Sequence, residues 1–129
     1  MHPHEEATIR AFIAPPRRPR WIESLASAKR RGGFLDRLNH CRDLDERFTN
    51  PLPSNADVPA LLRSRGAPKM CYILSATEII DGQELPLVEA VAQAEQNGWG
   101  TLISCVPGQL AYYYDECGER RMLLERTPG

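Results

Sequence analysis

The chain has 129 residues, 42% of them hydrophobic and 26% charged, with a formal net charge of −1. This length suits a single domain that buries roughly two-thirds of its extended surface, and the composition is typical of a globular protein. No apolar run approaches the ~20 residues that span a bilayer. The N-terminus also lacks the basic and then apolar layout of a secretory signal. We therefore exclude a transmembrane class and expect a cytoplasmic protein without a membrane partner.

Charge is divided unevenly along the chain. Residues 1–69 hold thirteen Lys and Arg against eight Asp and Glu, a net charge of +5, whereas residues 70–129 hold three against nine, a net charge of −6. The positive excess is concentrated between Arg10 and Arg42, where nine basic residues face two acidic ones. Such a patch attracts nucleic acid or an acidic protein surface. The alternative, which stays open, is that it packs against the acidic half of the same chain.

The first element, residues 1–20, is expected to be an N-terminal arm. An acidic first turn and the spacing of Ile9 and Phe12 favour a short amphipathic helix, although an extended segment is the alternative. Three prolines between residues 15 and 19 then end any helix and favour an extended, arginine-rich linker. We therefore place a single α+β domain at residues 21–129 and expect it to fold without the arm.

Residues 21–66 are predicted to be helical. Apolar side chains recur at helical spacing through residues 21–48. Gly32-Gly33 in their middle predicts a break into two helices, because each glycine costs roughly 1 kcal/mol in a helix interior; one bent helix is the alternative. The segment 50–55 is predicted to be a loop, after which Asp57 caps a short helix that ends near Gly66.

The second half, residues 69–126, predicts strands around one helix. The apolar run 70–74 is typical of a central strand covered on both faces. An acidic loop, a helix over 87–97 and a strand over 101–106 follow, and this helix permits a parallel, right-handed crossover. Two more strands complete a three-stranded antiparallel meander. The predicted class is α+β, with a helical N-terminal half packed on a strand-helix-meander half that forms one mixed sheet.

The basic segment is the favoured contact surface. Its candidate partner- or phosphate-binding residues are Arg17, Arg18, Arg20, Trp21, Lys29, Arg30 and Arg31. We expect a small interaction or regulatory module that uses a basic helical arm to contact an acidic protein partner or another copy of itself. The alternative is a nucleic-acid-binding accessory protein whose Lys and Arg side chains contact phosphates.

An acidic group follows the first strand and offers a second alternative, a small enzyme. Glu78, Asp81 and Glu84 occupy the region where open α/β sheets bind ligands, and paired carboxylates can hold magnesium or act as acid and base. A solvated loop is the favoured alternative, because acidic loops are common before a helix, whose N-terminus favours negative charge. No nucleophile or phosphate-loop motif accompanies them, so we expect no catalytic residue, cofactor or metal.

Three other features have structural explanations. Cys41 fits an apolar stripe, so we expect a core cysteine beside a surface histidine rather than a catalytic pair, and the scattered spacing of the four cysteines predicts free thiols. Trp99, between two glycines, is expected to close one end of the core, with an exposed anchor as the alternative. Tyr112 and Tyr114 should share one sheet face and Tyr113 the other.

Overall fold

A computed structural model describes residues 1–126 and has a six-stranded sheet at its centre. The strand order is β1-β6-β5-β4-β2-β3, and every neighbouring pair is antiparallel. The strands are β1 (Thr49–Pro51), β2 (Met70–Ser75), β3 (Glu84–Pro86), β4 (Thr101–Val106), β5 (Leu110–Tyr114) and β6 (Arg121–Glu125). The predicted α+β class is confirmed, with a larger sheet than expected.

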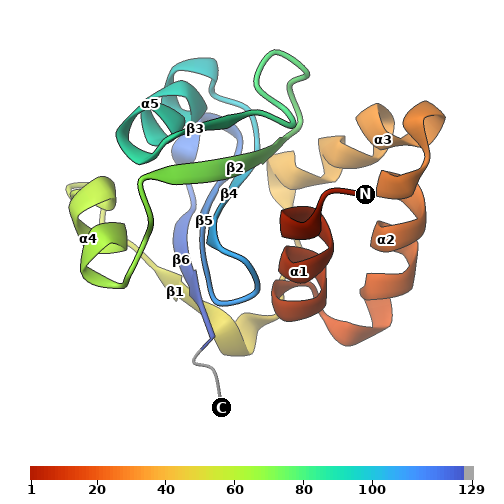
Figure 1. Cartoon of the computed structure of the whole chain (residues 1–129), viewed down its shortest axis with the longest axis horizontal. Coiled ribbons are helices and arrows are strands. Elements are labelled where there is room, and N and C mark those ends of the chain that lie inside the picture. Colours follow the sequence, from red (N-terminus) through yellow and green to blue (C-terminus); the bar gives the residue numbers. More distant parts are fainter. Residues whose placement is uncertain (127–129) are drawn as a thin grey trace.

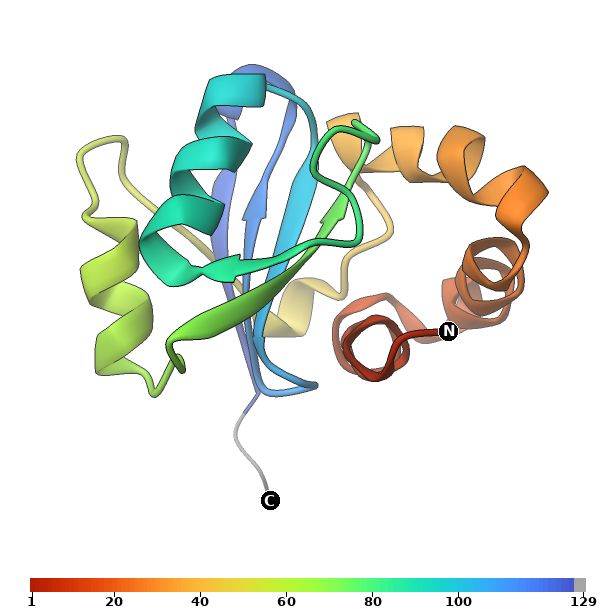
Figure 2. The same ribbon diagram turned by 45° about the horizontal axis from the view of Figure 1, so that its top comes forward.

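Helices cover both faces of this sheet (Figure 1; Figure 2). One face carries α1 (Pro3–Phe12), α2 (Arg18–Ala26) and α3 (Ala28–Leu35), and the other carries α4 (Val58–Ser64) and α5 (Leu87–Asn97). Short 3₁₀ turns lie in the connections between helices and strands, at Pro15–Arg17, Asp36–His40, Glu46–Phe48 and Glu116–Gly118. Within residues 1–126, no helix has the length and apolar character that crossing a membrane requires.

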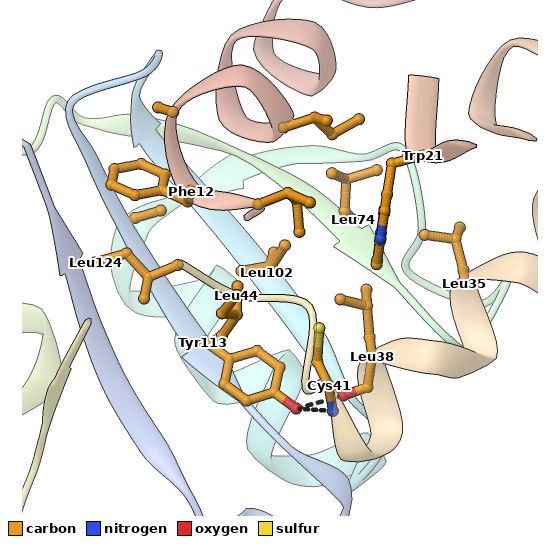
Figure 3. Close-up of a cluster of buried hydrophobic side chains, with 14 of the residues drawn as sticks. Phe12, Trp21, Leu35, Leu38, Cys41, Leu44, Leu74, Leu102, Tyr113 and Leu124 are labelled. Carbon is orange, nitrogen blue, oxygen red and sulfur yellow. Dashed lines mark hydrogen bonds between the residues drawn. The ribbon is translucent and has the colours of Figure 1, made fainter. Parts of the chain in front are cut away.

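Two hydrophobic cores result, because successive side chains of a strand point to opposite faces. In β5, Tyr113 belongs to the core under α1–α3, whereas Tyr112 and Tyr114 belong to the core under α4 and α5. The predicted alternation is confirmed, and all three rings are buried. The Tyr113 hydroxyl donates to the Leu38 carbonyl at 2.6 Å and accepts from the Cys41 amide at 3.1 Å (Figure 3).

The predicted parallel crossover from the first strand to the next is wrong. β3 lies within the segment expected to be an acidic loop, and it pairs antiparallel with β2 before α5 begins. α5 therefore connects β3 to β4, which run in the same direction with β2 between them. Consequently β2 and β4 are antiparallel neighbours, and the sheet is not mixed. Like β1, which was also expected to be loop, β3 has three residues and is too short for an alternating pattern to reveal it.

The predicted helix break at Gly32-Gly33 is also wrong. The chain breaks at Ser27, whose hydroxyl accepts a hydrogen bond from the Arg30 amide at 3.3 Å and caps α3. Both glycines lie inside α3 with open space around them. Beyond Leu35 the expected helix is replaced by 3₁₀ and extended backbone. By contrast, the Asp57 cap of α4 and the left-handed Gly98 that ends α5 are confirmed.

Residues 1–20 do not form a separate arm. Ile9, Phe12 and Ile13 are 0–1% exposed in the core beneath α1–α3, where Figure 3 shows Phe12 close to the sheet. The backbone after α1 is also fixed, because the Asp45 amide donates to the Phe12 carbonyl at 2.7 Å. The prolines occupy the first turns of a 3₁₀ helix and of α2, positions that proline favours. The proposed linker is therefore helical and continuous with the domain.

Candidate functional site

A groove of about 770 Å³ lies between α2 and α3. Its walls carry three cationic side chains, Arg20, Lys29 and Arg30, and one carboxylate, Glu23. Apolar surface comes from Pro16, Pro19 and Phe34. The groove therefore combines positive charge with apolar contact area.

The local sequence explains why these cations face outward. Trp21 and Leu25 lie one helical turn apart and are buried together in the core. Arg20 precedes the buried Trp21, so helical geometry directs its side chain about 100° away from the core. Ser27 then turns the chain, and α3 begins with Lys29 and Arg30 exposed beside α2.

The positive charge of the groove is only partly neutralised. Arg30 lies 3.4 Å from Glu23, but both side chains are largely exposed, and such pairs contribute little. Within residues 1–126, no carboxylate lies within ion-pair distance of Arg20 or Lys29. Two full positive charges are thus available to a ligand.

A smaller cavity of about 110 Å³ adjoins the groove and shares Arg20 and Phe34 with it. Its other lining residues are Arg17, Trp21, Arg37 and Asp43. We call it the arginine cavity. Three guanidinium groups against one carboxylate leave two positive charges uncompensated.

Asp43 organises the arginine cavity. Its carboxylate accepts hydrogen bonds from the Trp21 indole at 2.9 Å and from Arg37 at 2.9 and 3.2 Å. Burial alone would raise the pKa of Asp43, but the hydrogen bonds from Arg37 and Trp21 outweigh burial and hold this pKa below its usual value. The ionised carboxylate in turn raises the pKa of Arg37. Phe34 supports the same corner, packing edge-on against Trp21 with 4.9 Å between ring centroids.

The structure separates the seven predicted contact residues. Arg20, Lys29 and Arg30 line the groove, and Arg17 lines the arginine cavity. The other three have structural roles, although the buried Trp21 also forms part of the wall of the arginine cavity. Trp21 is 1% exposed, Arg18 donates to the Ile13 carbonyl at 2.8 Å, and Arg31 donates to Asp81 at 2.9 Å.

Sequence reasoning missed three residues of this site. Phe34 is one of the apolar side chains predicted at helical spacing through residues 21–48, and Arg37 and Asp43 were not singled out. Asp43 lies 22 residues from Trp21, so only the fold brings the two together. The one available signal was the continuation of the basic run to Arg37.

Arg31 connects the basic and acidic halves of the chain. Its guanidinium donates to Glu5 at 2.6 and 3.0 Å and to Asp81 at 2.9 and 3.2 Å. Burial would lower the pKa of Arg31, but the bonds to Glu5 and Asp81 reverse that effect and raise it. Glu5 is 3% exposed and also accepts a hydrogen bond from the Tyr72 hydroxyl. Arg31 therefore binds carboxylates of its own chain and is not available to a partner.

The acidic residues do not assemble into one site. Asp81 is engaged by Arg31 and accepts the Ser75 amide at 3.0 Å, whereas Glu84 lies beside His2 at 3.2 Å. Glu78 is exposed and lines a separate groove of about 460 Å³ with Asp81 and Trp99. Acid–base catalysis needs two groups directed at the same point. Here Asp81 is already bound by Arg31 and Glu84 contacts His2, so the three carboxylates do not form such a pair.

Trp99 is not a lid over the core, since 46% of its surface is exposed. The neighbouring Gly100 makes the close contact instead. A Cβ there would lie 2.1 Å from the Leu38 carbonyl, and the Gly100 amide donates to the Asn39 side chain at 2.8 Å. The glycine is therefore needed for backbone approach, and the tryptophan is directed outward.

Cys41 is confirmed as a buried cysteine beside an exposed histidine. Burial raises the pKa of its thiol to about 11, so the nucleophilic thiolate is scarce. His40 turns away to Glu116, 3.0 Å distant. All four cysteines are free, as predicted.

No protein-family model matches this chain, and no curated protein or solved structure does either. The groove and the arginine cavity are therefore the basis for assigning a function.

Proposed function

We propose that this protein is a non-enzymatic interaction module that binds an acidic segment of a partner protein in the groove between α2 and α3. The observation that carries this proposal is the pair of unneutralised cations, Arg20 and Lys29, beside the apolar surface of Phe34. Cations at the rim steer and orient an acidic segment. Apolar contacts beneath them supply the area that favours binding.

A protein segment suits this groove better than a nucleic acid does. Nucleic-acid binding draws its affinity from many phosphate contacts along an extended basic surface. Here the groove offers two unpaired cations, Arg20 and Lys29, rather than an extended basic surface, and the chain as a whole carries a net charge of −1. Nucleic-acid binding stays the alternative outcome of the test below.

The proposal is tested by fluorescence anisotropy with a labelled peptide that is rich in Glu and contains two leucines. The triple variant Arg20→Gln/Lys29→Gln/Arg30→Gln should weaken binding by at least about tenfold, since each lost charge–charge contact contributes roughly 0.5 kcal/mol or more. The matched control is Arg42→Gln/Arg63→Gln/Lys69→Gln. It removes the same charge at exposed positions that make no ion pair within residues 1–126.

Equal losses in both triple variants would mean that only net charge matters, and the groove would be rejected as the site. Tighter binding of a single-stranded or duplex oligonucleotide, lost in the groove variant alone, would favour the nucleic-acid alternative. Light scattering of the chain by itself adds a further comparison. A dimer that the groove variant abolishes would show that the acidic segment belongs to a second copy.

A further inference from the structure

Resting on that proposed function, we propose that the arginine cavity binds the phosphoryl group of a phosphorylated side chain on the partner segment. The cavity adjoins the groove through Arg20 and Phe34. A segment lying in the groove can therefore place one side chain into the cavity. Arginine clusters of this kind recognise phosphorylated and acidic motifs.

The charge of the arginine cavity matches a phosphoryl group. Arg17, Arg20 and Arg37 face one carboxylate, Asp43, which leaves two positive charges. A phosphorylated side chain carries about −1.5 to −2 at neutral pH, whereas Glu or Asp carries a single negative charge. A carboxylate would leave one guanidinium unpaired, and a phosphoryl group satisfies both.

The size of the cavity agrees with the same ligand. Its volume of about 110 Å³ is several times the ~30 Å³ that one water molecule occupies in the liquid. This space holds a tetrahedral group of a few heavy atoms. The larger groove of about 770 Å³ is left for the chain that carries the group.

The cavity is also organised in advance. Asp43 holds Arg37 through two hydrogen bonds and is itself fixed by the Trp21 indole. Arg37 lies over the Phe34 ring, 5.5 Å from its centroid. Arg17 is more loosely held, 3.8 Å from Asp43 and 63% exposed, so it can move onto an incoming anion. Guanidinium groups held in this way offer paired N–H donors that match phosphate oxygens.

The two tryptophans provide the readout for a direct test. The Trp21 indole N–H reports on the arginine cavity, whereas exposed Trp99 belongs to a different groove. Titration of the full chain with inorganic phosphate, followed by ¹H–¹⁵N NMR, should shift the Trp21 indole resonance to saturation. The Trp99 resonance should stay in place.

Peptide selectivity identifies the bound group. We compare an acidic, leucine-containing peptide carrying phosphoserine with the same peptide carrying Glu at that position. The phosphorylated peptide should bind at least about tenfold tighter. Arg17→Gln, which changes the cavity alone, should remove most of this preference. Lys29→Gln, which changes the groove alone, should weaken both peptides equally and keep the preference.

The outcomes separate this inference from the proposed function. Equal affinity for the two peptides, with Lys29→Gln weakening both, would overturn the phosphoryl assignment and leave the acidic-segment groove intact. A phosphate-induced shift of Trp21 without binding of either peptide would overturn both. An oligonucleotide that binds tighter than the phosphopeptide and loses affinity in Arg17→Gln would assign the cavity to a nucleic-acid phosphate instead.

Discussion

Arg30 and Arg31 are chemically identical neighbours with different surroundings. Arg30 lies at the rim of the groove and faces an exposed carboxylate, Glu23. Arg31 is largely buried and bridges Glu5 and Asp81, which come from opposite halves of the chain. One residue is therefore available to a ligand, and the other holds the domain together.

This contrast predicts different effects on stability. Arg31→Ala leaves the buried Glu5 carboxylate without its cation, and removing one partner of a buried pair typically costs about 3 kcal/mol or more. Arg30→Ala removes only an exposed pair, so the free energy of unfolding should fall by about 0.5 kcal/mol or less. Urea denaturation of the two variants measures both values. Similar losses in the two would show that the bridge adds no more than a surface contact.

At the level of elements, α1 is fastened to the sheet by its first residues. The His4 ring accepts or donates a hydrogen bond with the buried Ser104 hydroxyl at 2.7 Å, and the His2 ring stacks on Tyr72 with 4.0 Å between centroids. His2 also contacts Glu84. Burial, and then the neighbouring His2, lower the pKa of His4.

The lowered pKa of His4 predicts that stability depends on pH. Above about pH 6.5, His4 is neutral in both the folded and the unfolded chain, and its contribution is fully present. As the pH falls from about 6.5 to the lower pKa of the folded state, the unfolded chain takes up a proton first. Stability is then lost, by at most ~1.4 kcal/mol per pH unit for one proton. Below the folded pKa, His4 causes no further loss.

Urea unfolding between about pH 7.5 and about pH 5.5 tests this dependence. The slope of stability against pH should become smaller in His4→Gln. His40→Gln, at an exposed position outside the contact between α1 and the sheet, is the matched control. An unchanged slope in His4→Gln would assign the dependence to other groups.

Sequence patterns predicted the elements that are long or capped by distinctive residues. The strands β2, β4, β5 and β6 coincide with the predicted apolar runs, and α4 begins after the predicted Asp57 cap. β1 and β3 have three residues each and carry no usable periodicity. The break at Ser27 was missed because the prediction gave glycine propensity more weight than a serine cap, whereas α3 continues through both glycines.

The candidate site was predicted only in its local part. Arg20, Lys29 and Arg30 are close in sequence and were named together, and they share one groove. Asp43 and the separation of Arg31 from its neighbours depend on contacts across 22 to 50 residues. Such contacts follow from the packing of α1–α3 on the sheet, which no local pattern specifies.

For the whole molecule, the two cores lie on opposite faces of one sheet and depend on each other through its strands. α4 and α5 cover one face, and α1, α2 and α3 complete the other (Figure 2). α1 fills part of the core beneath α1–α3. The α2–α3 hairpin, which carries the candidate site, therefore packs on a surface that includes α1. The site and the stability of the chain are therefore linked.

Deletion of residues 1–14 should consequently unfold the protein rather than release an independent domain. Ile9, Phe12 and Ile13 are completely or almost completely buried, and each such side chain contributes roughly 1.5–3 kcal/mol. Their combined loss approaches the whole stability of a typical domain, about 5–15 kcal/mol.

Phe12→Ala alone should lower the free energy of unfolding by about 3–5 kcal/mol, and Arg10→Ala, at the exposed face of α1, by about 0.5 kcal/mol or less. Circular dichroism and urea denaturation measure these effects. A cooperative unfolding transition in the truncated chain would show instead that residues 15–129 fold by themselves.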